Sequence, residues 1–76
     1  MYFDEEILNF CRNVKFLREN NNLSKKEMAK ILGIGIGRLT KVEKGEIPER
    51  MSANVIINIC NYFDVLPNKL FEKILK

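Results

Sequence analysis

The chain has 76 residues, of which 46% are hydrophobic, and carries a formal net charge of +3. A chain of this length forms one small domain that buries only about 60–65% of its unfolded surface. It contains no histidine and only two cysteines, Cys11 and Cys60, which excludes a disulfide framework and a zinc cluster. We therefore expect a single domain over residues 1–76, with no metal or cofactor, in the reducing cytoplasm. No apolar run is long enough to predict a signal peptide or a membrane span.

A first helix is predicted to begin near Asp4, which is a good N-cap, and to end at the run Asn20–Asn22. Asparagine suits that end because it tolerates the left-handed conformation in which helices stop. The apolar residues of this segment recur at helical spacing, at Ile7, Phe10, Cys11, Val14 and Leu17. Leu8 and Phe16 fall outside this stripe, so they are either partly exposed or belong to a second surface, such as a dimer interface.

The stretch from Ser24 to Gly45 predicts two short helices joined by a tight glycine turn. Ser24 and Glu27 have the spacing of a capping box and open a helix over 24–32. Gly33 follows at once and suits a left-handed C-cap. The second helix, 36–44, is too short to be stable alone, so its apolar residues must pack onto the others. Two helices joined in this way form a helix-turn-helix.

The rest of the chain predicts a loop and two more helices. Residues 46–51 contain Pro48 and are expected to form the loop. Ser52 is the expected N-cap of a fourth helix that runs to about Tyr62. Its apolar face comprises Val55, Ile56, Ile59, Cys60 and Phe63. Pro67 suits the first position of a fifth helix. The stripe expected to dock that helix on the first one is Leu70, Phe71, Ile74 and Leu75.

The central stretch resembles the Cro/cI-type, or XRE-like, helix-turn-helix family of bacterial and phage repressors. The resemblance runs from about Phe10 to Phe71 and rests on Leu23, Ser24, Met28, Ala29, Gly33, Ile34, Leu39, Val42, Glu43 and Gly45. It implies an all-α, five-helix, lambda-repressor-like DNA-binding domain with a central helix-turn-helix at about 24–45. It also implies a homodimer on double-stranded DNA, with helix 36–44 in the major groove.

The same resemblance assigns base reading to the exposed side of helix 36–44. The residues concerned are Ile36, Gly37, Arg38, Thr40 and Lys41. Ile36 lacks a hydrogen-bonding group but fits a thymine methyl, whereas Lys41 reaches the guanine edge. Gly37 has no side chain with which to read a base. We therefore expect either sequence reading by few contacts, helped by DNA shape, or a helix that no longer reads DNA.

Phosphate binding is assigned to Lys25, Lys26, Lys44, Arg50 and Arg18. The first two lie at a helix N-terminus, where an anion is favoured, although each lysine also fits a plain solvated surface. Residues 11–50 hold ten bases and five acids, which is the charge bias expected of a segment that meets phosphates. The loop before the fourth helix is about two residues longer than the usual family spacing. Arg18 and Glu43 match a charge pair that the family keeps between the first and third helices.

These observations make a sequence-specific DNA-binding transcriptional regulator, a repressor, the leading hypothesis. The alternative is a protein-interaction or antitoxin-like module that keeps the fold with weak or lost base reading, so a protein partner stays open. Glycines 33, 35 and 37 follow no predicted strand and do not have the spacing of a dinucleotide site. The acidic residues are scattered and form no catalytic constellation, so no enzyme is predicted.

Overall fold

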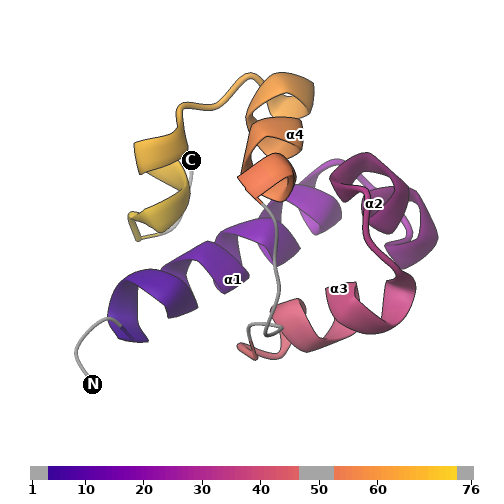
Figure 1. Cartoon of the computed structure of the whole chain (residues 1–76), viewed down its shortest axis with the longest axis horizontal. Coiled ribbons are helices and arrows are strands. Elements are labelled where there is room, and N and C mark those ends of the chain that lie inside the picture. The colour runs from indigo at the N-terminus through magenta and orange to yellow at the C-terminus, as the bar shows by residue number, and fades with distance from the viewer. Residues whose placement is uncertain (1–3, 47–52, 74–76) are drawn as a thin grey trace.

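The structure, a computed structural model, describes residues 4–46 and 53–73. These residues form four α-helices and one 3-10 helix and contain no strand (Figure 1). In chain order the elements are α1 (Asp4–Asn20), α2 (Lys25–Leu32), α3 (Ile36–Glu43), α4 (Ala53–Phe63) and η1 (Pro67–Phe71). The prediction of an all-helical fold is confirmed for this part of the chain. No helix in these two segments is both long and apolar enough to cross a bilayer.

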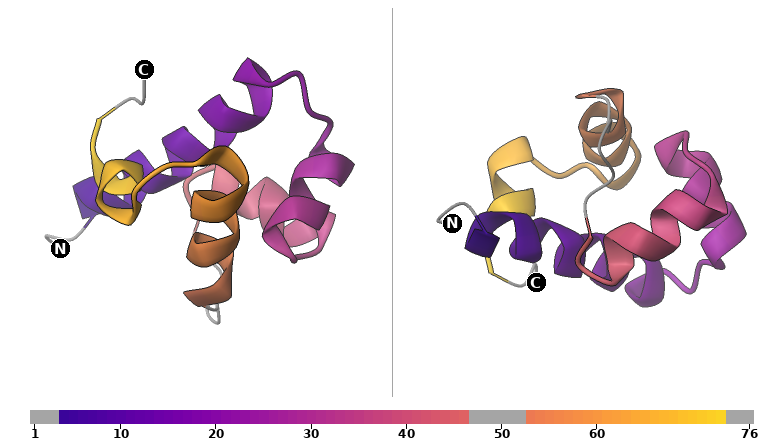
Figure 2. Two further views of the ribbon diagram at one scale, coloured as in Figure 1. Left: turned by 90° about the horizontal axis from the view of Figure 1, so that it is seen from above. Right: turned by 60° about the horizontal axis from the view of Figure 1, so that its bottom comes forward.

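The longest helix, α1, is the support on which the other elements are arranged. η1 lies beside its first half, whereas α2 and α3 occupy the opposite end of the molecule, and two further views in Figure 2 show the same arrangement. α3 packs against α1 and α2, and α4 packs against α2 and η1. α1 ends as predicted in an asparagine turn, because Asn22 adopts a left-handed φ of 56°.

The core forms where the apolar faces of all five elements meet. The buried apolar residues are Phe10, Cys11, Val14, Leu17, Met28, Ala29, Leu32, Leu39, Val42, Val55, Ile59 and Leu70. Ile36 shares the spacing of Leu39 and Val42 but stays outside this core. The remaining apolar positions of α4, at Ile56, Cys60 and Phe63, are partly buried against it. Amphipathic spacing thus identified nearly all of the packed surface.

The predicted fifth α-helix differs in the structure, because η1 is a 3-10 helix that stops at Phe71. Glu72 is extended, with φ −87° and ψ 170°, and Ile74 and Leu75 lie outside the described residues. The buried side chain of Asn13 donates from Nδ2 to the carbonyl oxygens of Leu70, at 2.7 Å, and of Glu72, at 2.9 Å. These carbonyl groups bond to α1, so η1 is fastened by side chains instead of by a continuing helical ladder.

Some predicted features fall on segments that the structure does not describe. The loop residues from 47 onward, including Pro48 and Arg50, lie outside the described residues. Ser52, the expected N-cap of the fourth helix, also lies outside them. α4 is described from Ala53, close to the predicted start of that helix.

Candidate nucleic-acid interface

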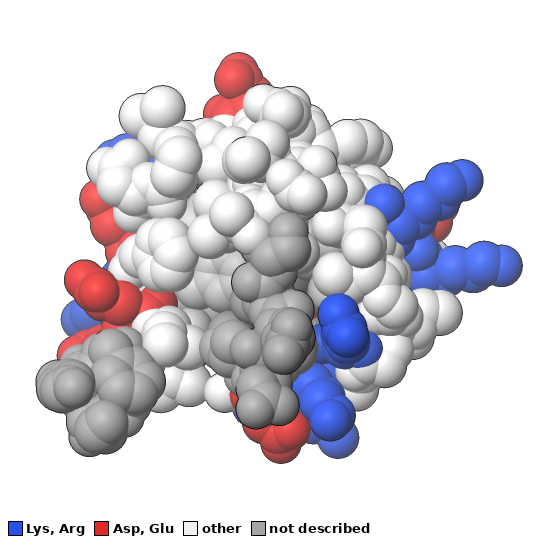
Figure 3. Space-filling model, viewed as in Figure 1, with Lys and Arg blue, Asp and Glu red and all other residues white. Residues whose placement is uncertain are grey.

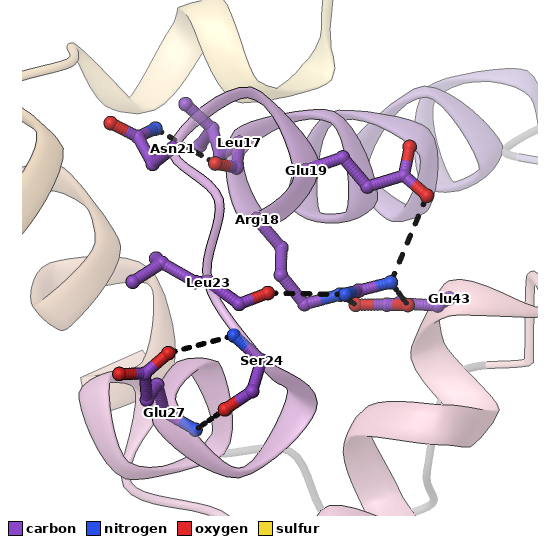
Figure 4. Close-up of polar contacts among 8 residues, drawn as sticks. All are labelled: Leu17, Arg18, Glu19, Asn21, Leu23, Ser24, Glu27 and Glu43. Atoms are coloured by element: carbon purple, nitrogen blue, oxygen red, sulfur yellow. Dashed lines mark hydrogen bonds and ion pairs between the residues drawn. The ribbon is translucent and has the colours of Figure 1, made fainter.

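The start of α2 is fixed by the capping box that the sequence predicts. Ser24 Oγ accepts a hydrogen bond from the backbone N–H of Glu27 at 3.0 Å (Figure 4). Glu27 Oε1 in turn accepts from the backbone N–H of Ser24 at 2.8 Å. The two bonds of the cap join Ser24 and Glu27 to each other and do not involve the backbone N–H groups of Lys25 and Lys26. The side chains of both lysines are exposed. An exposed helix start with two lysines attracts an anion through both the helix dipole and the ammonium groups.

The turn between α2 and α3 is held by a left-handed glycine and by α4. Gly33 has φ 78°, and its N–H donates to the carbonyl oxygen of Ala29 at 2.8 Å. The Nδ2 group of Asn58, on α4, donates to the carbonyl oxygen of Leu32 at 3.0 Å. One of the terminal carbonyl groups of α2 is thus satisfied from another helix. The direction in which the chain enters α3 follows from these contacts.

The other end of α3 is tied to α1 by the side chain of Arg18. Its Nε donates to Glu43 Oε2 at 2.7 Å, and its Nη2 donates to Glu43 Oε1 at 3.1 Å (Figure 4). Its Nη1 donates to the carbonyl oxygen of Leu23 at 3.2 Å, and Glu19 lies 3.8 Å from Nη2. The hydrogen bonds to Glu43 raise the pKa of Arg18, which therefore stays charged. One guanidinium group thus joins α1, the chain entering α2, and α3.

The pairing of Arg18 with Glu43 is a structural contact within the chain. The side chain of Glu43 is only 4% exposed and that of Arg18 is 15% exposed. Three of the five N–H groups of Arg18 donate to Glu43 and to the carbonyl oxygen of Leu23. Its principal effect is to fix the position of α3.

The two faces of α3 differ sharply. Leu39 and Val42 are fully buried, whereas Thr40 is half-buried. The exposed positions are Ile36, Gly37, Arg38, Lys41 and Lys44. The predicted base-reading residues thus occupy the outward side of the helix, with Thr40 at its margin. Because only the inward side carries the packing, the outward side is free to meet a ligand.

Charge is unevenly distributed over the face drawn in Figure 3. Most of the basic side chains visible there lie over α2 and α3, whereas acidic ones are more numerous toward the end where α1 begins. The exposed bases of α2, α3 and the residue after α3 are Lys25, Lys26, Lys30, Arg38, Lys41 and Lys44. These six basic residues outnumber the one exposed acidic residue of the two helices, Glu27, and such an excess of positive charge raises the local concentration of a polyanion. Among the described residues, no group of three or more histidine, cysteine or acidic side chains lies close enough together to hold a metal ion.

Three asparagines that support this arrangement were missed by sequence reasoning. Asn13 and Asn9 are buried and bind the backbone of η1, the latter through Phe71 O at 3.2 Å. Asn58 holds the end of α2. The available signal was the helical spacing of Asn9 and Asn13 beside the apolar stripe, since a polar residue on a buried face requires a partner.

A short capped helix, a left-handed glycine turn and a second helix with a basic outward face define a helix-turn-helix domain. The chain belongs to the XRE-like helix-turn-helix family, because a family model described as a helix-turn-helix domain matches residues 11–76. Comparison with curated proteins and with solved structures gave no significant match. The helix-turn-helix is a DNA-binding fold and not an enzymatic one, so family membership indicates a DNA-binding regulator.

Proposed function

We propose that the protein is a sequence-specific transcriptional repressor that places α3 in the major groove of double-stranded DNA. One observation supports this proposal most directly. α3 has a buried apolar side and an exposed side that is flanked by lysine and arginine side chains. A recognition helix needs both, because it must be held rigidly and still leave one side free to enter the groove.

Base reading is assigned to the outward residues of α3. Arg38 and Lys41 are exposed and have donors that match the O6 and N7 acceptors of guanine. Thr40 contributes a hydroxyl group from the margin of the surface. Gly37 contributes backbone only, and Ile36 contributes an apolar side chain. So small a set of reading groups implies that DNA shape supplies part of the specificity.

Phosphate binding is assigned to Lys25 and Lys26 at the start of α2, to Lys44 after α3, and to Arg50, which lies outside the described residues. These contacts fix the register of the protein on the duplex without reading its sequence. Arg18 was predicted to contact the backbone as well. Since its guanidinium is already bonded to Glu43 and Leu23, we assign it the role of positioning α3.

The protein is proposed to act as a homodimer on a near-palindromic operator, with half-sites about 34 Å apart, one turn of the duplex. The resemblance to this family implies the dimer, and a domain of this size is marginal without a partner. The cytoplasm is the proposed location, because both Cys11 and Cys60 are free thiols, as in a reducing compartment.

The proposal is tested by measuring duplex affinity by fluorescence anisotropy between about 50 and 200 mM salt. Four phosphate-binding side chains predict a slope of log affinity against log salt of about −3.6 per protomer. Replacing one of them, as in Lys25→Gln, makes that slope shallower by about 0.9. A duplex chosen by selection from random sequences should bind far more tightly than a scrambled one.

The matched control is Lys73→Gln, which removes an exposed lysine outside the motif, after η1. It should leave the slope within error of the wild type. Equal effects of the Lys73 and Lys25 variants would argue against phosphate binding at the start of α2. Failure to bind any duplex at low salt would refute the proposal and favour the protein-interaction alternative.

A further inference from the structure

Two glycines lie at the start of α3, Gly35 at its N-cap and Gly37 in its first turn, and neither has the positive φ that favours glycine. Gly35 has an ordinary extended backbone, with φ −77° and ψ 160°, and Gly37 lies within the first turn of the helix. A Cβ atom added to either would meet nothing within 4 Å. By contrast, Gly33 has a left-handed φ of 78°, and an added Cβ would lie 3.3 Å from Asn58 Nδ2.

Glycine inside a helix weakens it relative to alanine, and no neighbouring atom within 4 Å of an added Cβ requires a glycine at position 37. Gly37 lies on the outward side of α3, next to the exposed Lys41 one turn later. The absence of a side chain there lets another molecule approach the helix backbone closely. Gly35 and Gly37 lie on either side of Ile36 in the sequence, so another molecule can come close to the helix backbone next to Ile36.

Ile36 is 47% exposed at the start of α3, within a basic surface. Isoleucine has no hydrogen-bond donor or acceptor, so it recognises only an apolar group. Arg38 and Lys41 are exposed on the same helix, and Lys25 and Lys26 are exposed on α2. These basic side chains fit a polyanion better than an apolar protein face. In the major groove of DNA the apolar group on a base edge is the C5-methyl group of thymine.

We infer that Ile36 contacts the C5-methyl group of a thymine in each half-site, and that Gly35 and Gly37 allow the backbone of α3 to come close enough for this contact. The inference rests on the proposed function, because it requires α3 to lie in the major groove. It adds the chemical group that is read and the residue that determines the preference. 5-Methylcytosine carries the same methyl group, so the test separates the two bases.

The experiment starts from the duplex obtained by selection and replaces each thymine singly by deoxyuridine, which differs only in lacking the methyl group. The wild type should bind about fourfold more weakly when one particular thymine of a half-site is replaced, as expected for the loss of one buried methyl contact. In two further duplexes, that thymine is replaced by cytosine or by 5-methylcytosine, each paired with guanine, and the affinity of the protein for the two duplexes is compared. A gain from methylation shows that any C5-methyl is accepted, whereas no gain assigns the contact to thymine alone.

Ile36→Ala should abolish the difference between thymine and deoxyuridine at that position and leave the salt dependence intact. Because Ile36 is not part of the core, the variant should keep the wild-type circular dichroism spectrum and unfolding midpoint. Ile57→Ala is the matched control, since Ile57 is 52% exposed on α4 outside the motif. It should preserve the discrimination against deoxyuridine.

Equal affinity for thymine and deoxyuridine at every position, with salt-dependent binding retained, would overturn the inference and leave the proposed function standing. Discrimination that survives in Ile36→Ala would also overturn it. Loss of binding to every duplex would overturn the inference and the proposed function together.

Discussion

The ion pair between Arg18 and Glu43 gives the sharpest test of how α3 is held. In Glu43→Ala the guanidinium of Arg18 loses two hydrogen bonds, of 2.7 and 3.1 Å, and keeps the carbonyl oxygen of Leu23. Removing one partner of a buried pair costs about 3–5 kcal/mol, because the remaining charge is uncompensated. Since Arg18 is 15% exposed and so reaches some water, we expect the lower end, about 3 kcal/mol. A chain of 76 residues has a total stability of only about 4–11 kcal/mol, so the loss is a large fraction of it.

The measurement is equilibrium unfolding in urea, followed by circular dichroism. The free energy of unfolding of Glu43→Ala should fall by about 3 kcal/mol, with the denaturant slope unchanged. Glu19→Ala is the matched control, because Glu19 is 58% exposed and 3.8 Å from the same guanidinium. It should cost less than about 0.5 kcal/mol, as exposed ion pairs do. A loss below about 1 kcal/mol in Glu43→Ala would refute the argument that this buried pair holds α3.

Three further changes test the packing, the recognition helix and the buried thiols. Asn13→Ala should lower the free energy of unfolding by about 1–3 kcal/mol and speed amide hydrogen exchange in η1, because it leaves buried carbonyl groups without a donor. Gly37→Ala should raise that free energy by up to about 1 kcal/mol in urea unfolding, yet weaken duplex binding by filling the space needed for close approach. Burial raises the pKa of the Cys11 and Cys60 thiols above its ordinary value, so the unfolded chain loses these protons first. The contribution of the protonated thiols to stability is therefore complete below about pH 9 and is lost as the pH rises. The free energy of unfolding, measured between about pH 7 and 10, tests this expectation.

Each of these tests has a control within the chain. Asn61→Ala alters an exposed asparagine of α4 and should leave exchange in η1 unchanged. Gly33→Ala should destabilise the protein, in contrast to Gly37→Ala, because alanine is strained at a φ of 78°. The double variant that replaces Cys11 and Cys60 by alanine should lose less stability above about pH 9 than the wild type. If the wild type and the double variant lost the same amount of stability at high pH, the loss would come from groups other than the two thiols.

The parts of the fold that depend on local chemistry could be predicted from the sequence. The capping box of Ser24 and Glu27 and the left-handed turn at Gly33 involve residues within a few positions of one another, so spacing and residue type suffice. The apolar stripe of α1 could be predicted because the helical period of 3.6 residues places these side chains on one face, whichever element packs against them. The exposed side of α3 then follows as the complement of Leu39 and Val42.

The parts that depend on distant partners could not be predicted. The segment after Pro67 is held by Asn13, whose Nδ2 donates to Leu70 O from 57 positions away. Asn58 likewise bonds Leu32 O from 26 positions away. The spacing of Asn13 beside the apolar stripe indicates only that this residue needs a partner and does not identify Leu70, and asparagine is common in loops and on surfaces. Such bonds become visible only when the elements are packed together.

The arrangement around α3 separates folding from recognition. The helix has 8 residues, too few to be stable alone, and it persists because three anchors hold it: the turn at Gly33, the buried Leu39 and Val42, and the bond from Glu43 to Arg18. All three act on its inward side or at its ends. The outward side therefore contributes little to stability, and substitutions there are expected to change DNA preference without unfolding the protein. The same separation explains how the exposed Ile36 and Gly37 are tolerated at the start of α3 without loss of the fold.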